Sequence, residues 1–408
     1  MAKVLFGPVM FNLAEVTRMI EVARALDPRH TPVFFGYEDD YVSLVTGAGF
    51  EYRALTPAWT AAQRHQALRF DQAKTLRNPF TTELVAARVA AERALIRETN
   101  ARAVVIGTNA TSMISARAEG TTLWYAVPFA LTRPHVEQTR RLGLVRGTGR
   151  RGEALDLAAT AAFRWAYNHA PLAPRSFVRV AKANGISPLT TIASLLDADR
   201  NLLTVMPDEL EGYALPEGYE RVGPIFAHLD APMPAIVHDL ADRPEPLVYL
   251  GLGSSASRAL TLAAAHQLGT LPVHVVAPVR HYLKAGDKLP PNVHVTDLLP
   301  AHQLSGLVDA AVLHGGQGTV QTACATGVPF VGMGLQPEQT WNVSVSAARG
   351  NAIALSPRDA KTSKLAAAVR RLLEDESIRR VAAEVREEYA AEDGAAACAQ
   401  RIDASLRH

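Results

Sequence analysis

The stretch 314–342, HGGQGTVQTACATGVPFVGMGLQPEQTWN, constrains this chain more than any other part of its sequence. An apolar run at 310–313 leads directly into a turn with three glycines at 315–318. Glycine lets a backbone bend sharply and approach a ligand closely. The spacing of residues 319–326 fits a helix, so we expect a strand, a glycine turn and a helix in that order. The free N–H groups at the start of such a helix favour an anion such as a diphosphate.

Candidate diphosphate-binding residues gather in this turn, where amides, an imidazole and a hydroxyl can donate to phosphate oxygens. They are His314, Gly315, Gly316, Gly318 and Thr319. A second turn of glycines and hydroxyls, 251–255, follows another strand-like run, and Ser254 and Ser255 in it are further candidates. A plain tight turn accounts for 251–255 equally well.

A polar cluster follows the next apolar run, 330–333. It contains Glu338, Gln339 and Asn342, and it stands where a predicted parallel strand ends, which is where open α/β sheets bind ligands. A carboxylate accepts from two hydroxyls, while an amide both donates and accepts. The cluster therefore favours a polyhydroxylated ligand.

These residues together resemble the donor-site signature of the family 1 glycosyltransferases of the GT-B fold, which include plant and animal UDP-sugar enzymes and bacterial antibiotic glycosyltransferases. The shared pattern is His-Gly-Gly-x-Gly-Thr, then Gly-x-Pro, then Pro-Glu-Gln-x-x-Asn. The likeness is strong over roughly 245–390 and weakens to general architecture in the first half of the chain. It implies that the glycine turn with His314 holds the diphosphate of a nucleotide-sugar, and that Glu338 and Gln339 hydrogen-bond its sugar.

The expected fold class is α/β, because strand-like runs alternate with helical stretches as in parallel βαβ units. Strands are predicted at 4–6, 33–35, 103–106, 123–127, 247–250, 273–276, 293–295 and 310–313. Helices are predicted at 15–26, within 58–100, at 364–374, at 377–389 and from 394. The chain has 408 residues, 48% of them hydrophobic and 20% charged, which is enough for two domains.

The resemblance implies a GT-B fold, with two Rossmann-like domains whose parallel sheets face a central cleft and a last helix that crosses back to the first domain. The predicted division is an acceptor-binding domain at 1–222, a Pro-rich linker at 223–246, a nucleotide-sugar domain at 247–390 and the returning helix at 391–408.

Composition limits the partners. No apolar run approaches a membrane span, and the first strand follows Met1 directly, so we expect no signal peptide and a cytoplasmic protein. Two distant cysteines, Cys324 and Cys398, suit a reducing compartment. A net charge of +2 without aromatic platforms argues against nucleic acid. We expect neither a metal nor a cofactor, and we read the acidic run 38–40 as a loop or helix start. The oligomeric state stays open.

The nucleoside site departs from the family pattern. Where the family often stacks an aromatic residue on uracil, this chain has Leu298 and Leu299, which offer apolar contact and a backbone hydrogen bond. Thr322 stands where many UDP-sugar enzymes carry a glutamate that binds both ribose hydroxyls. A hydroxyl cannot make that bidentate contact, and deoxyribose lacks one of the two hydroxyls. Thr322 therefore favours dTDP, with UDP still open.

The predicted catalytic base also differs from the family pattern. The family places a histidine at the start of the first helix and an aspartate behind it. Here Glu15 occupies the histidine position, while Thr108 and Asn109 replace the aspartate. Glutamate is a weaker base than imidazole, so Glu15 suits an amine, amide or ring-nitrogen acceptor better than an alcohol. The alternative for Glu15 is a first-turn acid that the helix dipole favours.

The acceptor side is predicted in the first half of the chain, at Asn12, Thr108, Asn109, Arg133 and His135. The segment 133–182 holds ten Lys and Arg residues against three acids, so it either receives an anionic acceptor or is a solvated face.

The predicted function is an inverting transfer of a sugar from a UDP- or dTDP-sugar to a small acceptor in natural-product biosynthesis, with nitrogen among the candidate acceptor atoms. Retaining relatives carry two glutamates in the second domain, whereas only Glu338 stands near this donor loop. Two alternatives stay open: a catalytically silent homologue that binds nucleotide-sugar as a partner or regulator, and a nucleotide-sugar epimerase or hydrolase of the same fold.

Overall fold

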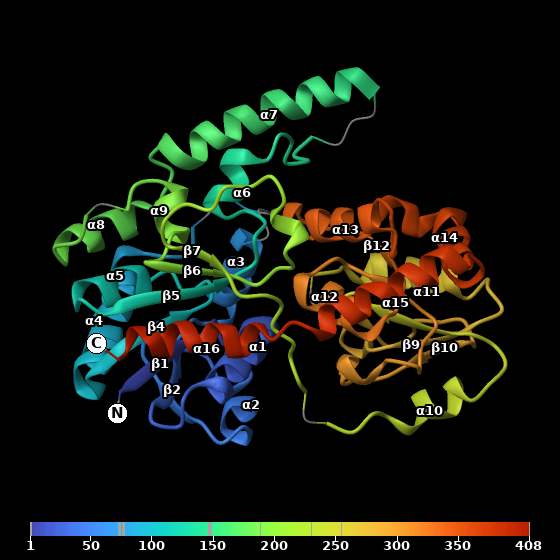
Figure 1. Ribbon diagram of the computed structural model, residues 1–408, viewed down its shortest axis with the longest axis horizontal. Coiled ribbons are helices and arrows are strands. Elements are labelled where there is room, and N and C mark those ends of the chain that lie inside the picture. Colours follow the sequence, from blue (N-terminus) through green and yellow to red (C-terminus); the bar gives the residue numbers. More distant parts are fainter. Residues whose placement is uncertain are drawn as a thin grey trace. The chain divides into compact units, whose positions relative to one another are not determined.

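The computed structural model of the chain describes residues 2–71, 75, 78–145, 149–187, 189–229, 231–253 and 255–407. These residues form two compact units. Unit 1 is Met1–Ile225 together with Asp393–His408, and unit 2 is Phe226–Glu392. Each unit contains one sheet of parallel strands with helices packed against it (Figure 1). The predicted α/β class is confirmed.

The sheet of unit 1 has seven strands in the order β3-β2-β1-β4-β5-β6-β7. Chain order reverses between β1 and β4, and open α/β sheets bind ligands at such a switch point, beyond the carboxyl ends of the strands. The strands are β1 (Lys3–Gly7), β2 (Thr31–Gly36), β3 (Glu51–Ala54), β4 (Ala101–Ile106), β5 (Thr122–Val127), β6 (Arg200–Leu203) and β7 (Tyr219–Arg221).

Helices connect these strands in sequence. They are α1 (Leu13–Ala25), α2 (Val42–Gly47), α3 (Ala61–Asp71), α4 (Thr82–Thr99), α5 (Ser112–Ala118), α6 (Arg133–Gln138), α7 (Gly149–His169), α8 (Arg175–Ala183), α9 (Ile192–Leu196), the 3₁₀ turn η1 (Asp208–Leu210) and, from the far end of the chain, α16 (Gly394–Ser405). The predicted helical region 58–100 is two helices. Thr81 begins the second by accepting from the Leu84 N–H, and Asn100 ends it in the left-handed conformation.

The last helix, α16, belongs to the core of unit 1. It packs against α1 (Figure 1), and its buried Cys398, Ala399 and Ile402 join the apolar cluster around β1. The segment that leads into α16 is held by a hydrogen bond from the Gly394 N–H to the Pro224 carbonyl (3.0 Å).

The sheet of unit 2 has six strands in the order β10-β9-β8-β11-β12-β13, with the switch point between β8 and β11. The strands are β8 (Leu247–Gly251), β9 (His274–Ala277), β10 (Val293–Val295), β11 (Ala310–Leu313), β12 (Phe330–Gly332) and β13 (Ala352–Ala354). The helices are α10 (Ala235–Ala241), α11 (Arg258–Leu268), α12 (Gln317–Thr326), α13 (Pro337–Arg349), α14 (Ser363–Glu374) and α15 (Glu376–Ala390), with 3₁₀ turns η2 (Arg280–Tyr282), η3 (Ala301–Gln303) and η4 (Pro357–Lys361).

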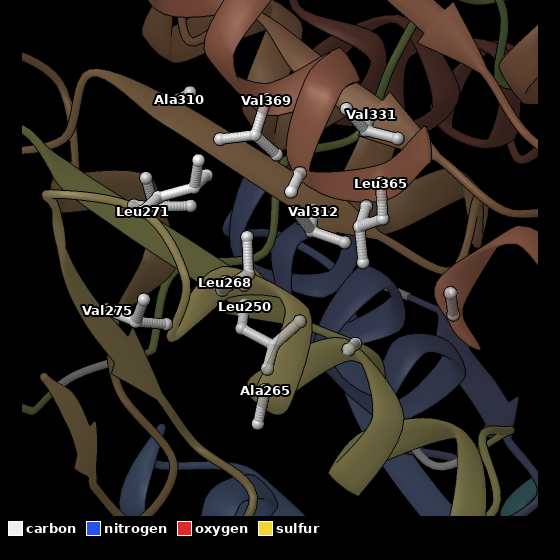
Figure 2. Close-up of a cluster of buried hydrophobic side chains, with 14 of the residues drawn as sticks. Leu250, Ala265, Leu268, Leu271, Val275, Ala310, Val312, Val331, Leu365 and Val369 are labelled. Carbon is white, nitrogen blue, oxygen red and sulfur yellow. The ribbon is translucent and has the colours of Figure 1, made fainter. Parts of the chain in front are cut away.

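The core of unit 2 lies between its sheet and the helices α11 and α14. Strand residues such as Leu250 and Val312 meet Leu268 of α11 and Val369 of α14, and all four side chains are buried (Figure 2). Burying side chains of this size contributes about 1.5–3 kcal/mol each, so this packing fixes the strands that carry the loops of the site.

The stretch 223–246, expected as a linker, is partly folded in the structure. It contains α10, whose Val237 and Leu240 are fully buried, and α10 belongs to unit 2. Prolines favoured a linker in the sequence, but Pro234 serves here as the residue before the first helical turn. No helix of the described residues has the length and apolar character needed to cross a membrane.

Candidate active site

The turns after β8 and β11 meet around His314, at the switch point of unit 2. The imidazole is buried and lies against two glycines. A Cβ atom added to Gly253 would stand 2.5 Å from its Cε1 atom, and one added to Gly316 would stand 2.5 Å from its Nε2 atom. Contacts this short do not occur, so glycine is required at both positions to make room for the imidazole.

The Nδ1 atom of His314 lies 3.4 Å from the Gly251 carbonyl oxygen. A carbonyl only accepts, so this contact assigns the ring proton to Nδ1 and leaves Nε2, next to Gly316, with its lone pair. Burial lowers the pKa of the imidazole, which is therefore neutral at pH 7. Such a ring donates to a phosphate from Nε2 only after it takes up a proton.

The amino-terminal end of α12 directly follows this turn. Gly316 precedes the first helical residue and has no side chain that could cap the helix, so α12 begins in the way that favours an anion at its first turn. The Thr319 hydroxyl donates to the Gly316 carbonyl (2.8 Å) and the Thr322 hydroxyl to the Gly318 carbonyl (2.7 Å). The backbone amides, not these hydroxyl protons, are the groups that α12 offers to an anion.

Helix α13 braces the glycine turn. Gly315 has a φ of +87°, and a Cβ atom there would stand 2.6 Å from the Gln339 carbonyl oxygen. The buried Asn342 amide donates to the Gly315 carbonyl (3.0 Å) and to Oε1 of Glu338 (2.6 Å). Asn342 was predicted as a sugar ligand, but its amide protons hold the turn and Glu338. The polar cluster is also not a loop, since it forms the first turns of α13.

Gln339 joins the two turns of the site. Its Oε1 atom accepts from the Leu335 N–H (3.0 Å), and its Nε2 group donates to the Ser255 hydroxyl (3.3 Å) in the turn after β8. Ser254, the other serine predicted in that turn, lies outside the described residues.

Leu298 and Leu299, the two leucines predicted to contact the nucleoside, lie between strand β10 and η3. η3 packs against α12, the helix that carries Thr322. Leu299 is buried, whereas Leu298 is 57% exposed. An exposed leucine at this position offers an apolar surface to a base.

Glu15 sits at the switch point of unit 1 with both carboxylate oxygens occupied. Oε2 accepts from the Val9 N–H (3.0 Å) and the Thr108 N–H (3.1 Å), while Oε1 accepts from the Asn12 amide (3.0 Å) and the Thr108 hydroxyl (2.7 Å). The side chain is buried, and a Cβ atom at Gly107 would overlap it. Four donors take up the four lone-pair sites of a carboxylate. The contact with Thr108 was expected, whereas the occupation of both oxygens was not, and it favours a structural role for Glu15.

Asn109 does not join Thr108 in backing Glu15. Its amide donates to Oε1 of Glu92 (3.3 Å) and to the Ser112 hydroxyl (3.1 Å). Glu92 is fully buried and also accepts from the hydroxyls of Tyr37, Thr111, Ser112 and Ser115. Sequence reasoning missed this network, although the run of hydroxyl residues at 108–115 was a visible signal for it.

The two remaining acceptor-side residues are both held within unit 1. Arg133 pairs with Glu137 (3.0 Å) and Asp197 (3.4 Å). His135 is buried, its Nδ1 accepts from the Leu131 N–H (3.2 Å), and burial lowers its pKa to about 4, which keeps the ring neutral. Within the described ranges, no group of three or more His, Cys, Asp or Glu side chains is arranged to hold a metal ion.

Known sequences similar to this chain are glycosyltransferases and a family of antibiotic biosynthesis proteins. Residues 264–404 match the C-terminal domain of the erythromycin biosynthesis protein CIII-like family. The chain is 28% identical to a PGL/p-HBAD biosynthesis glycosyltransferase of Mycobacterium tuberculosis, over 99% of this chain and 92% of that protein. It is 26% identical to a PGL/p-HBAD biosynthesis rhamnosyltransferase of Mycobacterium bovis, over 95% and 84% of the two chains.

Solved structures share the whole fold. The glycosyltransferase of kitacinnamycin superposes with a TM-score of 0.70 at 19% identity, covering 99% of this chain and 98% of that one. The glycosyltransferase VinC, in complex with dTDP, has a TM-score of 0.68 at 18% identity, again with 99% and 98% coverage. Full-length sequence relatives, a matching family domain and this shared architecture point to one enzyme class. The chain is a glycosyltransferase built on the GT-B fold, and it is similar to family 1 enzymes of natural-product biosynthesis.

Proposed function

We propose that this glycosyltransferase takes a sugar from a nucleoside diphosphate sugar bound by unit 2 and transfers it, with inversion and without a metal, to a small natural-product acceptor. One observation carries the proposal: the uncapped start of α12 lies next to His314, between two glycine turns that Gln339 links. Amides and an imidazole at this point suit a diphosphate, and the carboxylate of Glu338 on the adjoining α13 suits sugar hydroxyls.

The diphosphate is both the binding handle and the leaving group. Negative charge builds on it as the sugar bond breaks, and preformed donors stabilise that charge without reorganisation. The α12 amides and a protonated His314 would supply these donors, so a metal ion is not needed for charge neutralisation.

We favour a thymidine diphosphate donor. Thr322 is half-buried and has a single hydroxyl, which suits a sugar with one hydroxyl fewer than ribose. VinC and the spinosyn rhamnosyltransferase SpnG, which share this fold, have both been solved in complex with thymidine diphosphate (dTDP). The comparison of UDP with dTDP in titration calorimetry tests this preference, and a clear preference for UDP would overturn it.

Inversion follows from the proposed roles. In a single displacement the acceptor attacks the anomeric carbon opposite the leaving diphosphate, so no protein nucleophile is required. We assign Glu338 to the sugar hydroxyls, and Asn342, which donates to its Oε1, would orient the carboxylate. Glu15 acts as a positioning residue, and an amine, amide or ring nitrogen, which loses its proton late, is the acceptor atom that such a site favours.

Release of diphosphate from a panel of UDP- and dTDP-sugars, with and without candidate acceptors, tests the proposal as a whole. Acceptor-dependent release together with a glycosylated product supports it. Binding without release would instead establish the silent homologue, and release of free or epimerised sugar without acceptor would establish the hydrolase or epimerase.

His314→Gln is expected to weaken dTDP binding by about 1–3 kcal/mol, because one hydrogen bond to a charged group is lost. The wild-type imidazole takes up a proton on binding, since its pKa is lowered in the free protein and raised by the phosphate. Its contribution is therefore fully present at low pH and is lost as the pH rises through the pKa of the bound state.

Calorimetry in buffers of different ionisation enthalpy counts the protons taken up between about pH 6 and pH 8. The wild type should take up more than the His314→Gln variant, which serves as the baseline because the terminal phosphate titrates in the same range. Equal proton uptake by the two proteins would rule out His314 as a charged phosphate ligand.

Gln339→Ala is expected to reduce turnover far more than it weakens binding of bare dTDP, because we place its side chain at the sugar. Ser255→Ala is the matched control, since it removes only the bond that Gln339 makes to the other turn. Turnover and dTDP titrations on both variants decide the matter. If Gln339→Ala lowered turnover and dTDP affinity equally, and Ser255→Ala did the same, Gln339 would only hold the two turns together.

A further inference from the structure

Helix α7 has apolar surface on two opposite sides. One side is buried against α6, α9 and the segment before α7, in a cluster that includes Val136, Leu142, Tyr167 and Ala193 (Figure 1 shows α7 in green along the edge of unit 1, with α6 and α9 beside it). The other side is exposed, although its residues recur at the three- and four-residue spacing that normally marks a core-facing helix. It consists of Ala154, Leu155, Ala158, Ala161, Ala162 and Trp165.

The exposed side is large and contains almost no hydrogen-bonding groups. Leu155 is 61% exposed and Trp165 63%, and Leu172, just beyond the helix, is 55% exposed. Arg151 and His169 stand on the same side beyond its two ends, and the apolar stretch from Ala154 to Trp165 is roughly 17 Å long at 1.5 Å per residue. Contiguous exposed apolar surface of this kind marks a binding surface.

The charge around this surface selects its partner. The exposed bases nearby in sequence are Arg140, Arg150, Arg151, Arg175, Arg179 and Lys182. The two acids on α7 both pair with Arg141, Glu153 at 2.8 Å and the buried Asp156 at 3.1 Å. A second copy of this chain would bring the same positive charge, whereas an anionic surface is complementary to it.

We propose that α7 binds the surface of an anionic lipid bilayer, lying parallel to it with Leu155 and Trp165 inserted at the headgroup boundary. The helix carries too many charges to cross a membrane, but an apolar face bounded by arginines and containing tryptophan is typical of helices that lie in the interface. A protein partner would be expected to meet polar groups as well, since interfaces contain about one hydrogen bond per 100–200 Å². On this face the hydrogen-bonding side chains are the Trp165 indole and, at the two ends, Arg151 and His169.

The test uses the full chain in flotation with phosphatidylcholine vesicles that either contain or lack phosphatidylglycerol. The wild type should float only with the anionic vesicles, and high salt should release it. Arg150→Gln/Arg151→Gln should weaken vesicle binding by about fivefold for each charge removed. Arg370→Gln/Arg379→Gln, which removes two exposed arginines of unit 2, is the charge-matched control and should bind like the wild type.

Leu155→Gln/Trp165→Gln should abolish flotation while the unfolding temperature stays unchanged, because both side chains are exposed. Trp165 fluorescence, obtained as the difference from a Trp165→Phe variant, should shift to the blue with anionic vesicles. Wild-type protein that does not float at low salt would overturn the proposal. Flotation of Leu155→Gln/Trp165→Gln equal to that of the wild type would also overturn it. A wild-type dimer that this double variant converts to a monomer would overturn it as well, since the face would then bind a second copy.

Discussion

Gly316→Ala is expected to weaken dTDP binding by about 2–4 kcal/mol, the largest effect we predict on the donor site. The new Cβ atom would stand 2.5 Å from Nε2 of His314, so the imidazole must move out of its place. Overpacking of this kind costs about 1–3 kcal/mol, and the displaced imidazole loses its hydrogen bond to the phosphate as well. Both losses come from one methyl group.

Gly318→Ala is the matched comparison, since it adds the same methyl group two residues further on. A Cβ atom at Gly318 meets nothing within 4 Å, and alanine in a helix is about 0.5–1 kcal/mol better than glycine. Thermal unfolding should therefore show Gly318→Ala as stable as the wild type or more so. Calorimetry should still show weaker dTDP binding, because a Cβ atom in the first turn points towards the start of the helix, where we place the diphosphate. Unchanged dTDP affinity in both variants would place the nucleotide elsewhere.

Glu15→Ala is expected to destabilise unit 1 by about 2–4 kcal/mol, because it leaves the donors of Val9, Asn12 and Thr108 without their acceptor. Glu15→Gln should cost much less. Its carbonyl oxygen can keep the two backbone N–H donors, and its NH₂ group can donate to the Thr108 hydroxyl and to the Asn12 amide after that amide turns over.

The two variants Glu15→Ala and Glu15→Gln separate a structural role of Glu15 from a catalytic one. Denaturant unfolding measures the first effect, and the rate of sugar transfer by Glu15→Gln measures the second. A positioning residue predicts transfer close to the wild-type rate. A fall of about 10²- to 10⁴-fold with unchanged stability, as for a lost general base, would restore Glu15 to that role.

The donor half of the site was predictable because its signal is local. Strand 310–313, the glycine turn and the following helix occupy adjacent residues, and glycine is read directly from the sequence. The brace that Asn342 supplies was not predictable, since its two hydrogen bonds depend on where α13 begins. The polar Pro-Glu-Gln run is equally compatible with a loop and with the first turn of a helix.

The first half was harder because its decisive contacts are distant in sequence. Glu15 bonds to Thr108 from 93 positions away, and no spacing rule connects these residues. Strands β3 and β6 were missed because EYRA and RNLL are short and half polar. β3 is an edge strand and β6 lies beside the edge strand β7, whereas the central strands β1 and β4 are strongly apolar and were predicted.

The place of α16 has a consequence for biosynthesis. Because unit 1 takes its last core helix from residues that follow all of unit 2, the ribosome makes the whole of unit 2 before unit 1 can close its core. Until then the faces of α1 and β1 that later meet Cys398 and Ile402 stay uncovered on the nascent chain. Unit 2 is contiguous and can fold during synthesis, whereas unit 1 must wait as an incomplete intermediate whose bare apolar surface is a natural target for chaperones.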